Sequence, residues 1–345
     1  MIARLRIGCC AETDEPNWRW VSGALAAEPA DWTFFSNVPQ NALERAVRRP
    51  RLSRYRACRG LAAGARRGRF DLIVTHHPLV TCWTELFCRR RRTCQHVAFA
   101  FNFTGLPTGP RRTVMRRAFS TVDRFIVFSE FERTLYADYF QLPVERFEML
   151  HWGVREPEGL TSDASPPAQS NSQAICAVGS QARDYATLLE AMRRIPHIPL
   201  VLVATPANLR GLAVPPNVTV KLNIPRREAE AVIRQSRFMV LPLLDARVSC
   251  GHVTMVTAMY CSRALVATES SGISDYLIAG HNGLTVPPGD AAALAAAIEQ
   301  LWNDPATTTR LGTNGRAWAL AHCTEEQTIG YVRNLIYRVR GGEAV

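Results

Sequence analysis

Short apolar segments alternate with longer amphipathic segments along most of this chain. An apolar run of four to six residues between turn signals is typical of a strand that is buried on both faces of a parallel sheet. In the first half we expect such strands at Leu5–Cys9, Asp71–Thr75, His96–Phe101 and Arg124–Phe128, with helices at Ala42–Val47, Leu52–Ala65 and Thr113–Ser120. Alternation of strands and helices predicts a doubly wound α/β fold.

The same alternation returns in the second half, after a segment at residues 156–173 that is rich in Pro, Ser, Gly and Ala. The expected strands are Ala174–Val178, Leu200–Ala204, Val218–Leu222, Phe238–Leu241 and Ala264–Ala267. The expected helices are Tyr185–Arg194, Arg227–Ser236, Val253–Cys261, Ala291–Asn303 and Thr324–Arg340.

A chain of 345 residues is long enough for two domains. We predict an N-terminal Rossmann-like domain at residues 1–155, a linker at 156–173 and a second Rossmann-like domain at 174–323. Residues 324–345 are expected to form a C-terminal helix that crosses back to the first domain. Two such domains would face a cleft, and their ligands would bind at the carboxyl ends of the strands.

Basic residues are concentrated in the first half. Residues 1–150 hold 24 Arg against 14 Asp and Glu, a net charge of +10, whereas residues 151–345 hold 17 basic against 16 acidic residues, a net charge of +1. This asymmetry indicates an anionic partner, either nucleic acid, a membrane surface or a phosphorylated substrate, unless the charges are simply solvated. Nucleic acid is not expected, because the basic clusters lack a motif with interleaved base-stacking aromatic residues.

No apolar run is long enough to span a bilayer, and the first ten residues lack the apolar core of a signal peptide. We therefore expect a cytoplasmic protein, with peripheral association at the inner face of the cytoplasmic membrane as a further expectation. The ten cysteines include no CxxC pair, which agrees with a reducing compartment. Cys82, Cys88 and Cys94 are evenly spaced but lack the partners of a zinc site, so we expect no metal and no cofactor.

A polar cluster follows the expected strand Phe238–Leu241. A helix that begins near Gly251 would present free backbone N–H groups to an anion such as pyrophosphate, and the glycine would let the ligand approach closely. We expect Ser249 to cap this helix, with Thr254 and Thr257 on the same helical face as Gly251. An ordinary capped helix packed on the sheet is the structural alternative.

A second cluster, Gly179–Tyr185, joins the expected strand at Ala174–Val178 to the next helix. Its Arg183 would supply a fixed cation for a phosphate group. The alternative is a surface arginine beside a helix-capping Asp184.

Taken together, these segments resemble the donor-binding domain of GT-B glycosyltransferases, closest to glycosyltransferase family 4. The resemblance covers residues 174 to 305, and residues 122–129 and 152–154 resemble the end of the family's acceptor domain. The matching residues are Ala177–Gly179, Thr187–Ala191, Ala258, Met259, Val266–Thr268, Gly272, Asp275, Tyr276, Gly280, Asn282, Gly283, Pro288–Asp290 and Asp304.

The resemblance implies a hexosyltransferase that moves a sugar from a nucleotide-diphosphate sugar, with UDP or GDP, to a glycan or polyprenyl-diphosphate-linked acceptor. It also implies a metal-independent, retaining reaction in bacterial surface polysaccharide or glycolipid synthesis. In such a reaction the leaving phosphate helps to deprotonate the acceptor, whereas an inverting enzyme would need a separate base.

The site residues follow from this resemblance and from the clusters above. Arg183 and His252 are the expected catalytic residues, which would stabilise the leaving diphosphate. The expected donor-binding residues are Gly179, Ser180, Arg183, Ile224, Ser249, Gly251, His252, Val253, Thr254 and Thr257. The expected acceptor-side residues are Asp14, His76, His77 and Asn102.

Several positions depart from the family pattern. Ser249 and Thr257 match the two motif glutamates that contact the donor sugar and the ribose. Ser180 replaces an arginine, Arg183 takes the position of a lysine, and an acceptor-domain histidine of the family is replaced near Asn102, within Phe101–Thr104. These departures leave an alternative open, a catalytically degenerate GT-B protein that binds a nucleotide or a glycan.

The arginine clusters of the first half are interleaved with apolar and aromatic residues, which suits the surface of an anionic bilayer. We therefore predict a peripheral membrane protein, with the basic half as the acceptor domain. The interleaved residues are Tyr55, Leu61, Trp83, Leu86 and Phe87.

Overall fold

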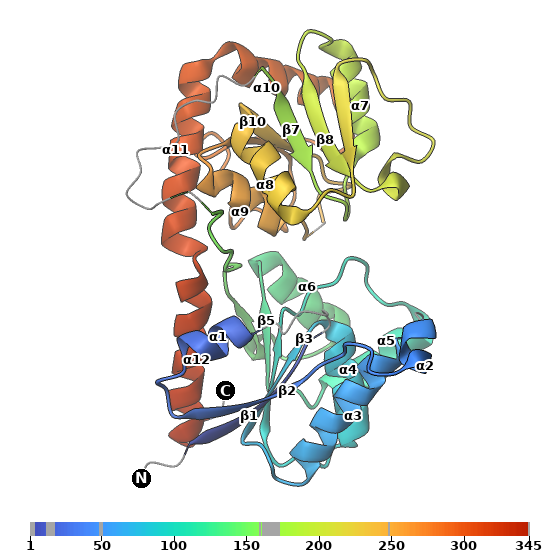
Figure 1. Cartoon of the computed structure of the whole chain (residues 1–345), viewed down its shortest axis with the longest axis vertical. Helices are drawn as coiled ribbons and strands as arrows, with labels where there is room; N and C mark the ends of the chain where they lie inside the picture. Colours follow the sequence, from blue (N-terminus) through green and yellow to red (C-terminus); the bar gives the residue numbers. More distant parts are fainter. Residues whose placement is uncertain are drawn as a thin grey trace. The chain divides into compact units, whose positions relative to one another are not determined.

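The computed structural model describes residues 4–11, 18–47, 51–158, 160, 173–247 and 249–343. The chain divides into two compact units, one formed by residues 1–150 with 326–345 and the other by residues 151–325. Within the described residues each unit is built on one six-stranded parallel sheet (Figure 1), so the predicted doubly wound α/β fold class is confirmed. Residues 151–155 belong to the second unit, although the sequence placed them in the first, and most of the expected linker lies outside the described residues.

The sheet of the first unit has the strand order β2-β1-β3-β4-β5-β6. Because the direction of strand addition reverses between β1 and β3, the loops that follow these two strands flank a switch point, where ligands of such sheets bind. The strands are β1 (Leu5–Cys10), β2 (Ala30–Phe35), β3 (Leu72–His76), β4 (Gln95–Phe99), β5 (Arg124–Val127) and β6 (Phe147–Met149).

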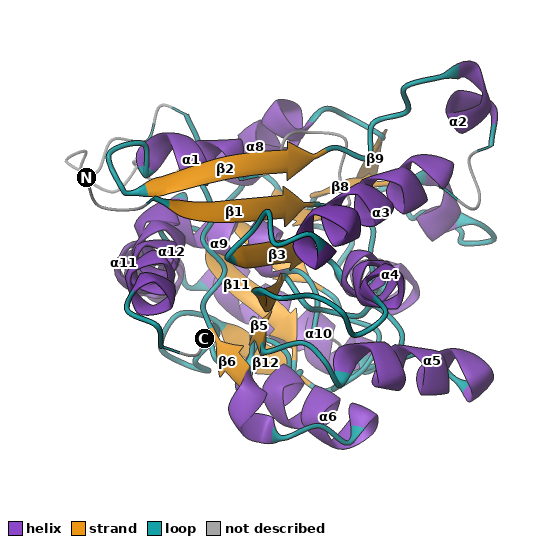
Figure 2. Cartoon of the chain, turned by 90° about the horizontal axis from the view of Figure 1, so that it is seen from below, coloured by secondary structure: helices purple, strands orange, loops and turns teal. Residues whose placement is uncertain are grey.

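Helices cover both faces of this sheet. Figures 1 and 2 show α3, α4 and α5 side by side on one face, with α1 and α12 on the other. The helices are α1 (Arg19–Ala24), α2 (Ala42–Ala46), α3 (Leu52–Arg66), α4 (Pro78–Cys88), α5 (Gly109–Phe119), α6 (Glu130–Phe140) and α12 (Glu325–Arg340), with a short 3₁₀ turn, η1 (Val144–Arg146).

The sheet of the second unit has the order β12-β11-β10-β7-β8-β9, and its switch point lies between β7 and β10. Its strands are β7 (Ile175–Val178), β8 (Leu200–Ala204), β9 (Val218–Leu222), β10 (Phe238–Leu241), β11 (Ala264–Thr268) and β12 (Leu284–Val286). The helices are α7 (Tyr185–Arg194), α8 (Arg226–Gln235), α9 (His252–Tyr260), α10 (Ala291–Asn303) and α11 (Pro305–His322), with a 3₁₀ turn, η2 (Pro206–Leu209). Helices α7 and α10 pack together over the apolar core of one face, and α9 packs with α11 against β11.

Several elements have no counterpart among the sequence-based expectations, namely β2, β6, β12, α1, α4, α6 and α11. Helix α4 is rich in apolar, β-branched and aromatic residues, so its composition does not distinguish a buried helix from a strand. Helix α11 is polar enough to read as a surface segment, but its Gly312 lets it approach the Ser262 carbonyl closely.

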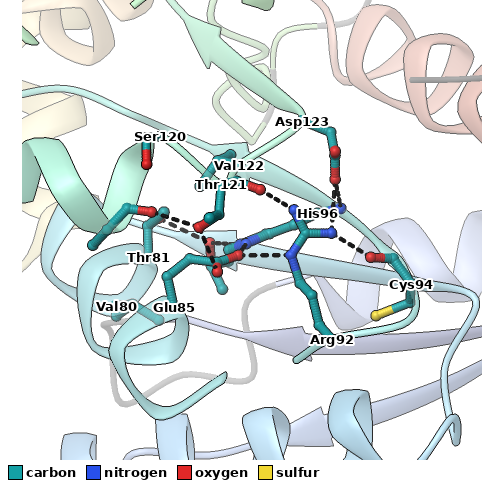
Figure 3. A network of polar contacts seen from close by, with 12 residues as sticks. Val80, Thr81, Glu85, Arg92, Cys94, His96, Ser120, Thr121, Val122 and Asp123 are labelled. Carbon is teal, nitrogen blue, oxygen red and sulfur yellow. Dashed lines mark hydrogen bonds and ion pairs between the residues drawn. The ribbon is translucent and has the colours of Figure 1, made fainter. Parts of the chain in front are cut away.

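A buried polar network links α4 to β4 and to the turn after α5 in the first unit (Figure 3). The Glu85 carboxylate, with 1% of its side chain exposed, accepts hydrogen bonds from His96 Nδ1 at 2.6 Å, Arg92 Nε at 2.9 Å and Thr121 Oγ1 at 2.7 Å. Burial by itself would raise the pKa of Glu85, but the interaction with His96, the charge of Arg92 and the hydrogen bond from Thr121 lower it to about 2. The carboxylate is therefore charged and fully paired at neutral pH.

Among the described residues, no helix combines the length and the hydropathy that a membrane crossing requires.

Candidate functional site

Two loops meet at the switch point of the second sheet. The loop after β7 contains Arg183, and the loop after β10 leads into α9. The loops are joined by backbone contacts, because Arg183 forms a β-bridge with Leu243 and the Leu244 amide donates to the Ala182 carbonyl at 3.2 Å. The structure therefore brings together the two polar clusters that the sequence singled out about 70 residues apart.

Arg183 is buried between these loops, with 8% of the residue exposed. Its Nη1 donates to the Gln181 carbonyl at 2.8 Å and its Nη2 donates to Thr254 Oγ1 at 3.1 Å, whereas its Nε has no hydrogen-bond partner. Within the described residues, the partners of this guanidinium are three carbonyl or hydroxyl oxygens and the Cys250 sulfur, and none of them is a carboxylate. A buried cation without a counter-ion is costly, so the site is electrostatically prepared for an anion.

Two glycines make room for this guanidinium. A Cβ at Gly179 would lie 2.5 Å from Arg183 Nη2, and one at Gly251 would lie 3.3 Å from the same atom. Both glycines also have positive φ angles, 136° and 95°, which other residues rarely adopt. We expected Gly251 to admit a ligand to the backbone, and the structure shows that it also accommodates the side chain of Arg183.

Helix α9 begins beside Arg183 with its first turn uncapped. Gly251 is the N-cap residue and offers no side-chain acceptor, so the prediction that Ser249 caps the helix is wrong. The Ser249 hydroxyl is instead buried without a hydrogen-bond partner. Uncapped N–H groups at a helix start attract negative charge, which adds to the field of Arg183.

His252, the first residue of α9, is a buried histidine. Its Nε2 lies 2.8 Å from the Gly272 carbonyl and therefore carries the proton of a neutral ring. Burial lowers the pKa of His252 to about 4, and the nearby Arg183 lowers it further, despite the opposing effect of the bond to Gly272. His252 is thus uncharged at neutral pH and ties α9 to the loop at Gly272, and its expected role at the leaving diphosphate stays a prediction.

The remaining expected donor-side residues differ in their positions. Thr254 accepts from Arg183 and donates to the Gly251 carbonyl at 3.0 Å, which fixes the guanidinium. Thr257 is buried and its hydroxyl donates to the Val253 carbonyl at 2.7 Å, so its hydrogen bond is made inside α9. Ser180 lies in the loop after β7, where its carbonyl accepts from the side chain of Asn208.

Ile224 is set apart from the other expected donor-side residues. It is half-buried in the loop after β9, a strand that β8 separates from β7.

Two of the four expected acceptor-side residues, His76 and His77, lie at the carboxyl end of β3, beside the switch point of the first sheet. His76 ends β3, and its ring lies 4.5 Å from that of Trp18 and 5.4 Å from that of Phe99. Burial lowers the pKa of His76 to about 3, and its buried Nε2 has no hydrogen-bond partner. His77 caps α4 by accepting from the Leu79 amide at 3.2 Å, so its ring nitrogen has a structural task.

Two further acceptor-side expectations concern the loops after β1 and β4. Asp14 lies outside the described residues, and Asn102 is half-buried in the loop after β4. Three non-glycine residues around these strand ends have positive φ angles, Trp18 at 79°, His77 at 84° and Ala100 at 49°. Backbone strain of this kind collects at functional sites.

The sequence reasoning overlooked Trp18 and Phe99 in the first unit and Cys250 in the second. In the sequence, their one detectable signal is that they follow an expected strand or lie near its end. The contacts of the Trp18 and Phe99 rings with His76 depend on the strand order, which the sequence does not show. In the parts of the chain that the structure describes, no three His, Cys, Asp or Glu side chains gather as metal ligands.

Two family profiles match this chain. The family described as Glycosyl transferases group 1 matches residues 172–304, and Glycosyltransferase Family 4 matches residues 22–156. Two curated relatives whose names contain the word glycosyltransferase are EpsD of Bacillus subtilis, 34% identical over 68 residues, and MJ1178 of Methanocaldococcus jannaschii, 27% identical over 103 residues. These matches cover 20% and 30% of this chain and only 18% and 28% of the two relatives.

Solved structures share the fold over nearly the whole chain. Sucrose-phosphate synthase from Thermosynechococcus elongatus superposes with a TM-score of 0.77 at 20% identity, covering 99% of this chain and 100% of that chain. Anabaena HepE, crystallised in complex with UDP, superposes with a TM-score of 0.71 at 14% identity, covering 98% of this chain and 100% of that chain.

Proposed function

Because this chain belongs to the glycosyltransferases of group 1 and family 4 and has their GT-B type of fold, we propose that it is a sugar-transferring enzyme. Its donor is a nucleotide-diphosphate sugar, and its acceptor is a glycan or a polyprenyl-diphosphate-linked saccharide. The reaction belongs to the synthesis of bacterial surface polysaccharides or glycolipids.

One observation carries this proposal, the buried Arg183 without a carboxylate partner in the described residues, beside the uncapped start of α9. A diphosphate supplies the negative charge that this place lacks, and the switch point of a parallel sheet is where such ligands bind. When the bond between sugar and phosphate breaks, negative charge builds up on the leaving diphosphate. Preorganised donors that face this charge, Arg183 and the first N–H groups of α9, lower the barrier.

UDP is the nucleotide that the comparisons favour, since HepE was crystallised with it, and GDP is the alternative. We further propose that the reaction needs no metal ion, because the guanidinium and the helix start provide positive charge at the diphosphate. In this proposal the sugar keeps its anomeric configuration, and an oxygen of the leaving phosphate takes the proton of the acceptor hydroxyl. The neutral His76 then binds the acceptor rather than acting as a strong base.

The donor proposal is tested by thermal unfolding with UDP, GDP and UDP-glucose. Arg183→Gln removes the charge, and the matched control Arg193→Gln changes an exposed arginine at the opposite end of α7, about 13 Å along the helix. UDP at 100 times its Kd stabilises the folded state by about 2.7 kcal/mol, so the wild type and Arg193→Gln gain Tm and Arg183→Gln does not. No gain for the wild type with any of the three ligands, or an equal gain for Arg183→Gln, would overturn the proposal.

The acceptor proposal includes association with an anionic membrane surface through the layer formed by α3, α4 and α5 (Figure 2). Residues 51–122 hold 15 Arg and only two acidic residues, Asp71 and Glu85. Asp71 pairs with Arg6, and Glu85 is buried in its network, so neither neutralises the exposed arginines of this layer. In this proposal the protein is cytoplasmic and rests on the inner face of the cytoplasmic membrane.

Vesicle co-sedimentation tests this association. The variant replaces the exposed Arg111, Arg116 and Arg117 of α5 by Gln, and the control replaces the exposed Arg193, Arg226 and Arg227 of the second unit in the same way. Each arginine near an anionic surface contributes about 1 kcal/mol, so the α5 variant binds phosphatidylglycerol vesicles about 100-fold more weakly than the control. Equal binding of both variants, or binding that added salt does not weaken, would contradict the proposal.

A second candidate function is that of a degenerate GT-B protein that binds a nucleotide without catalysis. It is favoured by Ser249 and Thr257, which stand where the family has glutamates, one with an unpartnered hydroxyl and the other bonded inside its helix. Release of UDP from UDP-sugars in the presence of lipid-linked saccharides decides between the two functions. Binding of UDP without any release favours the second candidate.

A further inference from the structure

One cysteine differs from all the others in this chain. Within the described residues none of the ten forms a disulfide, and nine of them are buried, whereas Cys250 is partly exposed. It immediately precedes Gly251, the N-cap residue of α9. Its thiol donates to the Gln181 carbonyl at 3.4 Å, and its sulfur lies 4.0 Å from Arg183 Nη1.

The nine buried cysteines are shielded from a reagent in the folded protein. Burial raises the pKa of Cys82 to about 12 and that of Cys94 to about 11, and similar surroundings raise the pKa of Cys176 to about 12. Since the thiolate is the reactive form, these thiols are both inaccessible and protonated. A reagent in solution should therefore find a single reactive thiol, that of Cys250.

A second, independent observation is that two buried polar groups without a partner belong to residues next to this thiol. Arg183 and Ser249 are each 8% exposed, and the Arg183 Nε and the Ser249 hydroxyl have no partner. An anionic ligand held by Arg183 would sit within reach of the Cys250 sulfur. Attraction to a fixed cation raises the local concentration of an anionic reagent and its rate of encounter.

We propose that Cys250 is a modification site, at which small disulfides that carry carboxylates react with the thiol and thereby exclude a nucleotide from Arg183. The reaction is thiol–disulfide exchange. The Cys250 sulfur forms a bond to one sulfur of the disulfide, the original S–S bond breaks, the second half leaves as a thiolate, and the proton lost by Cys250 passes to the solvent. The disulfide is the oxidant, and a thiol reductant reverses the step.

The exclusion of nucleotide rests on the proposed donor site, whereas the reactivity of Cys250 does not. The exclusion of nucleotide and the reactivity of Cys250 are both measured by the reaction of the native protein with dithiobis(nitrobenzoate). Each half of this reagent carries a carboxylate, and the thiolate that it releases is coloured. We expect one fast equivalent for the wild type and none for Cys250→Ser; after unfolding, all ten thiols of the wild type and the remaining nine of the variant should react. Arg183→Gln should react about tenfold more slowly, and Arg193→Gln at the wild-type rate.

Uncharged dithiodipyridine serves as the matched reagent, because the charge of Arg183 does not attract it to the thiol, so its rate should fall less than that of the anionic reagent in Arg183→Gln. Unchanged melting curves of the variants without ligand show that they fold. The proposal is overturned if Cys250→Ser keeps the fast equivalent, or if Arg183→Gln slows both reagents equally or neither.

The same reaction in the presence of UDP tests the exclusion of nucleotide. If Cys250 reacts as expected but UDP does not protect it, the modification site stands while nucleotide exclusion fails. If UDP also leaves the Tm of the wild type unchanged, the donor proposal itself is contradicted.

Discussion

Removing the Glu85 carboxylate should destabilise the first unit strongly. In Glu85→Ala, the buried His96 and the nearly buried Arg92 lose the acceptor that they share (Figure 3). The pKa of Glu85 falls from 4.5 to about 2 on folding, a difference that corresponds to about 3 kcal/mol. Breaking a buried ion pair by removing one partner typically costs about 3–5 kcal/mol, so both arguments lead to the same range.

The pH dependence gives this prediction a second test. Because the folded-state pKa is lower than the unfolded one, the contribution of the Glu85 carboxylate is fully present above pH 4.5 and disappears as the pH falls towards 2. The difference in stability between the wild type and Glu85→Ala should therefore be largest near pH 7 and shrink below pH 4.5.

Urea unfolding at several pH values measures the effect, with Glu130→Ala as the control. Glu130 pairs with Arg133 on the surface of α6 of the same unit, with 53% of its side chain exposed, and such pairs contribute at most about 1 kcal/mol. If Glu85→Ala and Glu130→Ala shift the unfolding midpoint equally, or if the Glu85→Ala effect does not change between pH 7 and pH 3, the reasoning is refuted.

Two glycine substitutions should separate binding from stability. Gly179→Ala places a Cβ 2.5 Å from Arg183 Nη2 at a φ of 136°, so it should abolish the rise in Tm with UDP, as titration by thermal unfolding will show. If Gly179→Ala still binds UDP, the position of the Arg183 guanidinium is not required for UDP binding. Gly312→Ala drives a Cβ of α11 into the Ser262 carbonyl and should cost about 1–3 kcal/mol, visible as a lower Tm without ligand. An unchanged Tm would show that α11 can move away.

Local signals in the sequence were sufficient for several elements. The predicted helices Tyr185–Arg194 and Ala291–Asn303 agree with α7 and α10, because Asp184 and Asp290 each precede the helix and cap it by accepting from a backbone amide. The apolar strands were equally visible, since burial on both faces requires an uninterrupted apolar run. Edge strand β2 was missed because its exposed Asp31 and Thr33 interrupt such a run.

The sequence by itself determined the alternation of strands and helices, the basic character of the first half, and the two strand-to-helix loops that carry Arg183 and Gly251. Only the tertiary structure decided that these loops lie at one switch point and that the guanidinium occupies the space left by two glycines. It also decided that His252 is neutral, because desolvation depends on everything packed around a ring and not on its neighbours in the chain. Residues distant in sequence supply that surrounding, and no spacing or motif records it.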